Sequence, residues 1–306
     1  MHAVPTATLV SWNLKGSAGP DVAGVVDHLR AEGADVVALQ EVQWHQARRI
    51  ARGLGARSWR WGFKHWPGNT WPEGMAVIGV TQPARVRSRA LSHRWRLWSW
   101  RRRIVQVATV LGPGGSDEAD GVGAGGSGPG GHGSDAREGR DAGRDDGGSG
   151  PGDSGAFTLV NVHLTPHREA ELRAVETAAV LALTTPHAEP TVVSGDLNER
   201  PGGQIHGLLA AGGLRDGWGE GPGADPPPAG TPGQADPWPT NWTAWYRGTP
   251  EAPTRQLDYV YVSHSVATVT VSAPRAGDAE AGAGDDLVRF ATLSDHLLVT
   301  AVLELP

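Results

Sequence analysis

Six short motifs place carboxylate, amide and imidazole side chains directly after apolar segments of this chain. Because loops that follow strands often carry functional groups on a rigid scaffold, these motifs are candidates for a reaction centre. Each residue alone also has a structural explanation, such as an Asx turn. Together they supply hard oxygen ligands for a magnesium-like cation and polar groups that match phosphate oxygens. The residues are Asn13 (SWNLKG), Glu41 (LQEV), His163 (NVHL), Asp196 and Asn198 (SGDLNERPG), Asp258 (QLDYVYV), and Asp295 with His296 (LSDHLLV).

A second candidate segment is rich in arginine and tryptophan. Residues 85–103 (RVRSRALSHRWRLWSWRRR) contain eight arginines and no acidic residue. Cations interleaved with indole rings are typical of a surface that binds phosphates and stacked bases. The same alternation also describes a half-buried strand with a charged outer face, so both interpretations stay open. The candidate substrate-binding residues are Arg94, Arg96, Trp98, Arg101 and Arg102.

The elements that must position these residues are predicted by the apolar pattern. Short runs rich in Val, Leu and Ala, bounded by Gly, Pro or polar turns, predict strands. Apolar residues at helical spacing predict helices over 22–29 and 172–183, and a third is expected over 43–54. This order predicts a mixed, layered α/β architecture and not an alternating parallel barrel. The predicted strands are ATLVSW, ADVVALQ, GMAVIGV, RIVQVATVL, FTLVNVHL, PTVVSGDL, LDYVYVS and LLVTAVLEL.

The segment 112–156 differs in composition from the rest of the chain. It has almost no large apolar residue and cannot bury enough surface to order itself, so we expect a disordered Gly/Asp-rich insert. Its nine acidic residues and three arginines account for the whole formal charge of −6. If the flanking strands pair as a hairpin, the insert is a long loop, and each doubling of loop length costs only about 0.6 kcal/mol. We therefore expect residues 1–306 to form a single domain.

Composition also narrows the classes of site. The chain has no cysteine, which excludes disulfides, thiolate zinc sites and cysteine nucleophiles. The N-terminal segment has no basic region before an apolar core, and no apolar run approaches the roughly 20 residues that span a bilayer. We expect a cytoplasmic protein with no membrane partner, and no obligate protein partner is inferred.

The ordered set WN, QE, HL, GDLN, LDY and SDH resembles the endonuclease/exonuclease/phosphatase family, from near the first residue to near the last. GDLN followed about a hundred residues later by SDH is the specific part of this resemblance. The resemblance implies a deoxyribonuclease I-like α/β (α+β) fold. Two β-sheets would pack face to face in a four-layered sandwich flanked by helices, with the active site at one end.

The resemblance also implies a metal site. Glu41 corresponds to the principal ligand of Mg²⁺ or Mn²⁺, with Asn13 beside it and Asp295 bound directly or through water. Glu73 (PEGMAVIG) corresponds to an acidic residue that, in some members, orients the histidine of the HL motif.

The remaining roles implied by the resemblance concern water and phosphate. Asp196 would orient or deprotonate the attacking water. His163 and Asn198 would donate hydrogen bonds to the non-bridging phosphate oxygens. Asp258 would hold His296 in its tautomer and charge state.

These observations predict divalent-metal-dependent hydrolysis of phosphodiester bonds by in-line water attack, with DNA or RNA as the substrate. A phosphodiester repels hydroxide, so catalysis requires charge neutralisation, aligned water and stabilisation of the leaving oxygen. A small or lipid-linked phosphate ester is an alternative substrate, because this fold serves several chemistries. A catalytically idle member that binds nucleic acid is a third reading, and the presence of Glu41, Asp196 and His296 together weighs against it.

Overall fold

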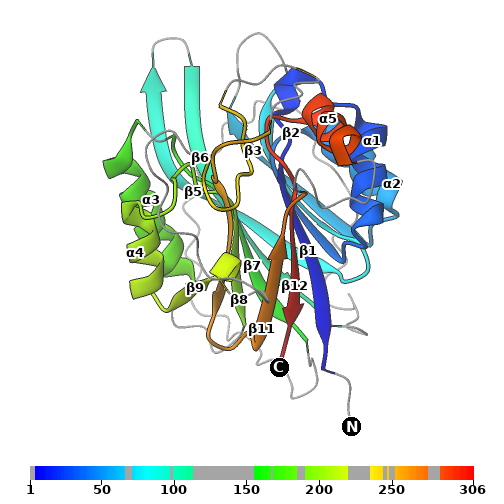
Figure 1. The fold of residues 1–306 in the computed structure, drawn as a ribbon. Coiled ribbons are helices and arrows are strands. Elements are labelled where there is room, and N and C mark those ends of the chain that lie inside the picture. The colour runs from blue at the N-terminus through cyan, green and yellow to red at the C-terminus, as the bar shows by residue number, and fades with distance from the viewer. Residues whose placement is uncertain are drawn as a thin grey trace, which may run out of the picture.

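The protein is a sandwich of two β-sheets with helices on the outer faces (Figure 1). The computed structural model describes residues 4–65, 71–96, 99–112, 155–166, 168–184, 190–219, 235–243, 247, 252–274 and 283–306. Within these residues the expected α/β fold of two packed sheets flanked by helices is confirmed. No helix in the described part of the chain is both long and apolar enough to cross a membrane.

Each sheet contains one parallel pair of strands among antiparallel neighbours. In the first sheet the parallel pair is β1 with β2, and in the second it is β7 with β8. The two sheets are joined in the described residues by one residue pair, His65 with Arg101. The first sheet has the order β11 (Thr268–Ser272), β12 (Val299–Glu304), β1 (Thr6–Asn13), β2 (Val36–Gln43), β4 (Glu73–Gly79) and β3 (Ser58–His65). The second has the order β5 (Ala84–Arg96), β6 (Ser99–Val110), β7 (Phe157–His163), β8 (Thr191–Asp196), β10 (Asp258–Ser263) and β9 (Leu214–Asp216).

The helices cover the outer faces, as Figure 1 shows for α1, α2 and α5 on one side and α3 and α4 on the other. The three predicted helices, over 22–29, 43–54 and 172–183, are all present. Asp21 caps the first by accepting a hydrogen bond from the amide of Ala23, and Gly55 ends the second with a φ of +66°. The helices are α1 (Val22–Ala31), α2 (Trp44–Leu54), α3 (Ala170–Thr184), α4 (Gln204–Ala211) and α5 (Ala283–Leu293), with short 3-10 turns η1 (Gly16–Ala18) and η2 (Gly217–Gly219).

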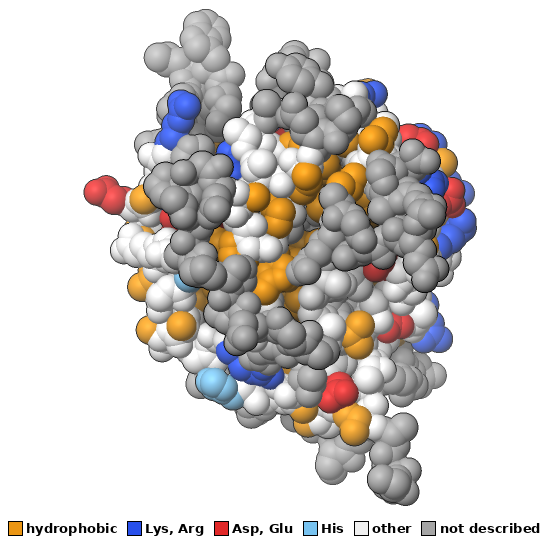
Figure 2. Space-filling model, in the orientation of Figure 1, with side chains coloured by type: hydrophobic (Ala, Val, Ile, Leu, Met, Phe, Trp, Pro, Cys, Tyr) orange, Lys and Arg blue, Asp and Glu red, His pale blue; other side chains and the backbone are white. Residues whose placement is uncertain are grey.

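Helix α2 illustrates why these segments lie on the surface. Its buried residues include Ala47 and Ile50, whereas Arg48, Arg49 and Arg52 are exposed. Figure 2 shows charged side chains gathered at the margin of the molecule over α1 and α2, while hydrophobic side chains lie nearer the centre of this face. An apolar stripe therefore fixes each helix to the sheet, and the polar face stays in water.

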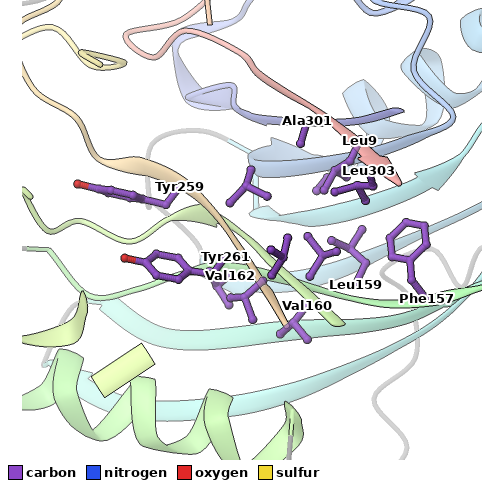
Figure 3. Close-up of a cluster of buried hydrophobic side chains, with 14 of the residues drawn as sticks. Leu9, Phe157, Leu159, Val160, Val162, Tyr259, Tyr261, Ala301 and Leu303 are labelled. Carbon is purple, nitrogen blue, oxygen red and sulfur yellow. The ribbon is translucent and has the colours of Figure 1, made fainter. Parts of the chain in front are cut away.

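The core lies between the two sheets (Figure 3). Burying each large apolar side chain contributes about 1.5–3 kcal/mol, so this layer fixes the position of one sheet on the other. A second core layer lies between the first sheet and its helices. In Figure 3, Leu9, Ala301 and Leu303 of the first sheet lie across from Phe157 and Leu159 of the second. Val160, Val162, Tyr259 and Tyr261 are on the other face of the second sheet, where His206 of α4 contacts both tyrosine rings.

The strands on either side of the Gly/Asp-rich insert pair as expected. β6 and β7 are antiparallel, with Val110 opposite Phe157. Most of the insert, residues 113–154, lies outside the described residues.

The arginine-rich segment forms the β5–β6 hairpin, so its interpretation as strand backbone is confirmed.

Candidate active site

A polar cleft of about 320 Å³ opens where the parallel strands of both sheets end. The structure thus brings together residues that are widely separated in the sequence, as the motifs predicted. Seven of the candidate residues line the cleft: Asn13, Glu41, His163, Asp196, Asn198, Asp295 and His296. It is also lined by residues that the motifs did not single out, namely Lys64, His65, Arg103, Pro166, Asn241, Arg255 and Leu257.

Strand register explains why the second sheet contributes three neighbouring side chains. His163 ends β7 directly opposite Asp196 of β8, and Asp196 lies opposite Asp258 of β10. Parallel strands present their carboxyl ends at the same edge, which is where ligands bind in sheets of this kind. The three residues therefore meet because each is the first or last residue of its strand.

The first sheet supplies Glu41 through a β-bulge. The pairing of β2 with β4 shifts between Leu39 and Val42, and Glu41 has a φ of +49°. A non-glycine residue in this region is strained, and such strain concentrates at functional sites. The bulge faces Gly74, where a Cβ would lie 2.1 Å from the carbonyl oxygen of Gly62, so no side chain fits there.

Buried amides behind the cleft tie the two sheets together. Gln40, which precedes Glu41, donates a 2.8 Å hydrogen bond to the side-chain oxygen of Asn161 in β7. Asn161 in turn donates to Gln106 of β6 at 3.2 Å. Because a buried amide without a partner is destabilising, this network favours one relative position of the QE and NVHL motifs.

Asp258 and His296 form a buried carboxylate–imidazole pair. The Nδ1 atom of His296 lies 2.8 Å from Oδ2 of Asp258, which also accepts a 2.6 Å hydrogen bond from Thr240. Burial disfavours the imidazolium, but Asp258 outweighs this and raises the pKa of His296 to about 10. His296 is therefore a cation at neutral pH.

Asp196 lies between two imidazoles. Its Oδ2 atom is 3.6 Å from Nε2 of His163 and 3.8 Å from Nε2 of His296. Asn13 donates to Oδ2 at 3.0 Å, and the backbone amide of Asn198 donates to Oδ1 at 2.8 Å. Burial raises the pKa of Asp196 to about 6, so the carboxyl group can change protonation state near neutral pH.

Lys64 fixes the tautomer of His163. Its Nζ atom lies 2.9 Å from Nδ1 of His163 and 3.3 Å from Oε1 of Glu41. A lysine ammonium can only donate, so Nδ1 accepts and the ring proton is on Nε2, facing Asp196. Burial lowers the pKa of His163 well below its usual value, which keeps this imidazole neutral.

The contacts of Glu73 correct one expectation. Glu73 was expected to orient His163, but its Oε1 atom accepts from the amide of Ser17 at 2.6 Å and its Oε2 atom lies 3.3 Å from Nε2 of His65. Among the described residues, Lys64 is the partner that holds Nδ1 of His163. The β3 bulge that brings Lys64 inwards is the physical reason.

Several oxygen donors in the cleft could hold a cation. The side chains of Glu41 and Asp295 are 25% and 17% exposed, and Lys64 and Lys15 lie against them at 3.3 and 2.6 Å. The Oδ1 atom of Asn13 accepts a hydrogen bond from the backbone amide of Lys15, and its Nδ2 atom donates to Asp196. In the described part of the chain no three His, Asp or Glu side chains form a metal cage. This donor set fits Mg²⁺ or Mn²⁺, which bind through one or two carboxylates, water and substrate oxygens.

The arginine and tryptophan candidates are only partly described. The backbones of Arg94, Arg96, Arg101 and Arg102 lie on the β5–β6 hairpin. Their side chains, and the whole of Trp98, lie outside the described residues. The next arginine along β6, Arg103, lines the cleft.

The two-sheet sandwich with a polar cleft at the strand ends defines a deoxyribonuclease I-like protein. Residues 10–296 match the model of the endonuclease/exonuclease/phosphatase family, and the chain belongs to this family. A search of the curated proteins finds no match.

Solved structures agree with this assignment at the level of the fold. A family protein from Bacteroides vulgatus has a TM-score of 0.63 at 14% identity, over 98% of this chain and 99% of that one. A family protein from Beutenbergia cavernae has a TM-score of 0.60 at 22% sequence identity, and the match covers 98% of this chain and 72% of that one. The human Nocturnin catalytic domain with bound sulfate has a TM-score of 0.59 at 16% sequence identity, and the match covers 98% of this chain and 93% of that one.

Proposed function

We propose that this protein is a divalent-metal-dependent phosphodiesterase that cleaves nucleic acid by in-line attack of water. The observation that carries the proposal is the place of Asp196, between two imidazoles of different charge and against the amides of Asn13 and Asn198. This arrangement offers a base for water and donors for a phosphate within one cleft.

Asp196 is the group that would orient and deprotonate water. Above a pH of about 6 its carboxylate is ionised and can accept a proton. Asn13 and Asn198 hold both oxygens, so the carboxylate keeps one orientation as the water approaches. A base fixed in this way is most effective when its pKa lies near the working pH.

The two histidines would act on the phosphate in different ways. His163 is neutral and offers its Nε2 proton to a non-bridging oxygen. His296 is cationic and would stabilise the negative charge that grows in the transition state. The Nδ2 atom of Asn198 donates to the carbonyl of Leu164 at 3.0 Å, which leaves its second proton for the substrate.

Glu41, with Asn13 and Asp295, would hold the metal ion. A bound Mg²⁺ or Mn²⁺ supplies charge neutralisation for the phosphate oxygens. Partial desolvation raises the pKa of Glu41, but the surrounding cations, Lys64 first among them, lower it by more, so the carboxylate is ionised and able to bind. The bulge at Glu41 keeps this carboxylate on the cleft side of β2.

Nucleic acid is the proposed substrate because a cationic hairpin adjoins the cleft. β5 and β6 contain Arg94, Arg96, Arg101 and Arg102, and β6 continues into Arg103 at the cleft wall. Binding of a polyanion is driven by such phosphate contacts.

The second candidate is a small phosphate ester, favoured by the size of the cleft. At about 320 Å³ the cleft is near the lower end of the roughly 300–1,000 Å³ range of small-molecule sites.

A family member that only binds nucleic acid is the less favoured candidate. The cleft contains Glu41, Asp196 and His296 together, and binding alone needs no base beside a metal ligand.

An activity panel tests the proposal. The purified chain is assayed with Mg²⁺, with Mn²⁺ and with EDTA on DNA, RNA, a chromogenic phosphodiester and a chromogenic phosphomonoester. We expect metal-dependent cleavage of a nucleic acid and of the diester. Turnover of the monoester alone would favour the second candidate, and full activity in EDTA would exclude the metal mechanism.

A further inference from the structure

A bulge in β3 turns two successive side chains into the same cleft. Side chains normally alternate between the faces of a strand, so Lys64 and His65 would point in opposite directions. The register of β3 against β4 shifts between Phe63 and His65, which leaves Lys64 as the extra residue. Both Lys64 and His65 consequently line the cleft.

His65 is held by its own carboxylate, separate from the Asp258–His296 pair. Its Nε2 atom lies 3.3 Å from Oε2 of Glu73, a side chain only 3% exposed. The other oxygen of Glu73 accepts a 2.6 Å hydrogen bond from the amide of Ser17 in η1. Glu73 is therefore held from both sides, and it keeps the imidazole of His65 at one place in the cleft wall.

Arg103 places a permanent charge on the same wall. It lies two residues beyond Arg101, the backbone partner of His65, and it lines the cleft. Its charge acts on Glu41, Lys64 and His163, which shows that it is close to the reaction centre. The cleft thus has an acidic side around Glu41, Asp196 and Asp295 and a cationic side from β3 and β6.

The side chains that β3 and β6 place at the cleft wall differ in their surroundings. Lys64 fixes His163 and contacts Glu41, whereas His65 and Arg103 line the cleft beside it. A planar guanidinium and an imidazole beside a carboxylate are suited to a phosphate dianion.

We propose that His65, positioned by Glu73, and Arg103 form a second phosphate site next to the scissile phosphate. This inference rests on the proposed function and narrows its substrate class. Preferred substrates carry a further phosphate group on the nucleoside adjacent to the bond that is cleaved.

Dinucleotides with one scissile bond test this site. Thymidylyl-thymidine is compared with its 5′-phosphorylated and its 3′-phosphorylated forms, with Mg²⁺ present. We expect kcat/KM for one phosphorylated form to exceed that of the parent by about tenfold or more, as one charge-assisted contact provides. The p-nitrophenyl ester of thymidine 5′-phosphate, with and without a 3′-phosphate, forms a second arm. If the extra phosphate raises kcat/KM in the dinucleotides alone, the substrate class is nucleic acid. If it raises kcat/KM in both arms, the site accepts any ester with a neighbouring phosphate group.

The variants His65→Gln and Arg103→Gln should each bring the ratio of phosphorylated to parent kcat/KM close to one. Asn198→Ala is the matched control, because it should lower both rates and keep the ratio. A wild-type ratio near one in both arms, or a ratio that survives both replacements, overturns the second site while leaving phosphodiester hydrolysis intact.

A binding measurement keeps the two proposals distinguishable. Calorimetry with the Asp196→Asn variant compares the affinities of the parent and phosphorylated dinucleotides without turnover. Tighter binding of a phosphorylated form, lost on adding His65→Gln, supports the site even if no substrate is hydrolysed. Equal affinities overturn it.

Discussion

His296 and Asp258 are hydrogen bonded at 2.8 Å across a sequence separation of 38 residues. The contact forms because His296 enters the site immediately before the last strand, whereas Asp258 begins β10. It sets the charge of His296, which is a cation at neutral pH because its pKa is raised to about 10. Changes to this pair should therefore alter both the activity and the free energy of unfolding of the protein.

His296→Ala should lower kcat by about a hundredfold or more with little loss of folding, as expected for a group that acts mainly in the transition state. Asp258→Asn should lower it less, because the imidazole remains but loses its charge. The measurement is kcat on a chromogenic diester with circular dichroism as the folding check. A near-wild-type rate in the His296→Ala variant would refute the assignment.

The same pair predicts a pH dependence of stability. The pKa of His296 is about 10 in the folded chain and near 6.5 when unfolded. Between these values the folded protein keeps a proton that the unfolded chain has lost, so the contribution is complete below about pH 6.5 and disappears as pH rises to 10. The free energy of unfolding should fall across this window, and the fall should be smaller in His296→Gln. Parallel pH profiles for the two proteins contradict the pKa assignment.

Asp196→Asn should abolish activity and also stabilise the fold. Because the pKa of Asp196 is raised to about 6, its ionised form is destabilising at neutral pH. We expect a rise in Tm of roughly 2–6 °C. Asp216 is the matched control: burial also raises its pKa to about 6, but it does not line the cleft. Asp216→Asn should raise Tm and leave activity unchanged. A lower Tm in Asp196→Asn would show that its ionised form is favourable.

Glu41→Gln should weaken metal binding. The replacement removes the charge of the carboxylate that the bulge presents to the cleft, so the metal concentration for half-maximal activity should rise by about tenfold or more. Electron paramagnetic resonance of bound Mn²⁺ measures the site without turnover. Glu171→Gln, on the exposed side of α3, is the control. Equal Mn²⁺ affinity in all three proteins would remove Glu41 from the metal site.

Deleting residues 114–153 should leave fold and chemistry intact. β6 and β7 already pair up to Val110 and Phe157, so a short turn can join them and the loop closure becomes shorter. Tm and diester hydrolysis of the deletion variant are the readouts. Failure to fold, despite a short replacement turn, would show that the insert contributes to the folded domain and is not a disordered loop.

The β5–β6 hairpin should determine the salt dependence of nucleic-acid binding. Replacing Arg94 and Arg101 by glutamine should weaken binding and lower the salt slope by about 0.9 per contact on duplex or 0.7 on single strands. Trp98→Ala should weaken single strands more than duplex, if its indole stacks on a base. Fluorescence anisotropy across a salt series, in an Asp196→Asn background, gives these values. Arg85→Gln with Arg87→Gln is the control from the far end of β5. Unchanged slopes in the Arg94 and Arg101 variant would favour the small-ester candidate.

The sequence by itself determined eight of the twelve described strands and the residues at their ends, whereas β3, β9 and β11 were not predicted and β5 was one of two open interpretations. Apolar runs that finish in Asn13, His163 and Asp196 predict both a buried strand and a polar group at its carboxyl end. Helices α1 and α3 followed from local apolar spacing in the same way, because each depends on contacts within one segment, whereas α4 and α5 were not predicted. These features could be predicted, since burial and chain direction are encoded locally.

Only the tertiary structure decided the cationic side of the cleft and the partner of each carboxylate. Lys64 and His65 belong to a strand whose pattern gives no sign of a site, and Arg103 is the last residue of the arginine-rich segment but was not among its candidate substrate-binding residues. Their positions depend on bulges opposite Gly74 and on the register between β3 and β6, and a shift of one residue would turn these side chains to the other face. The bulge in β3 places Lys64 against His163 and His65 against Glu73. Register and bulges are set by packing between distant segments, which no local pattern in the sequence records.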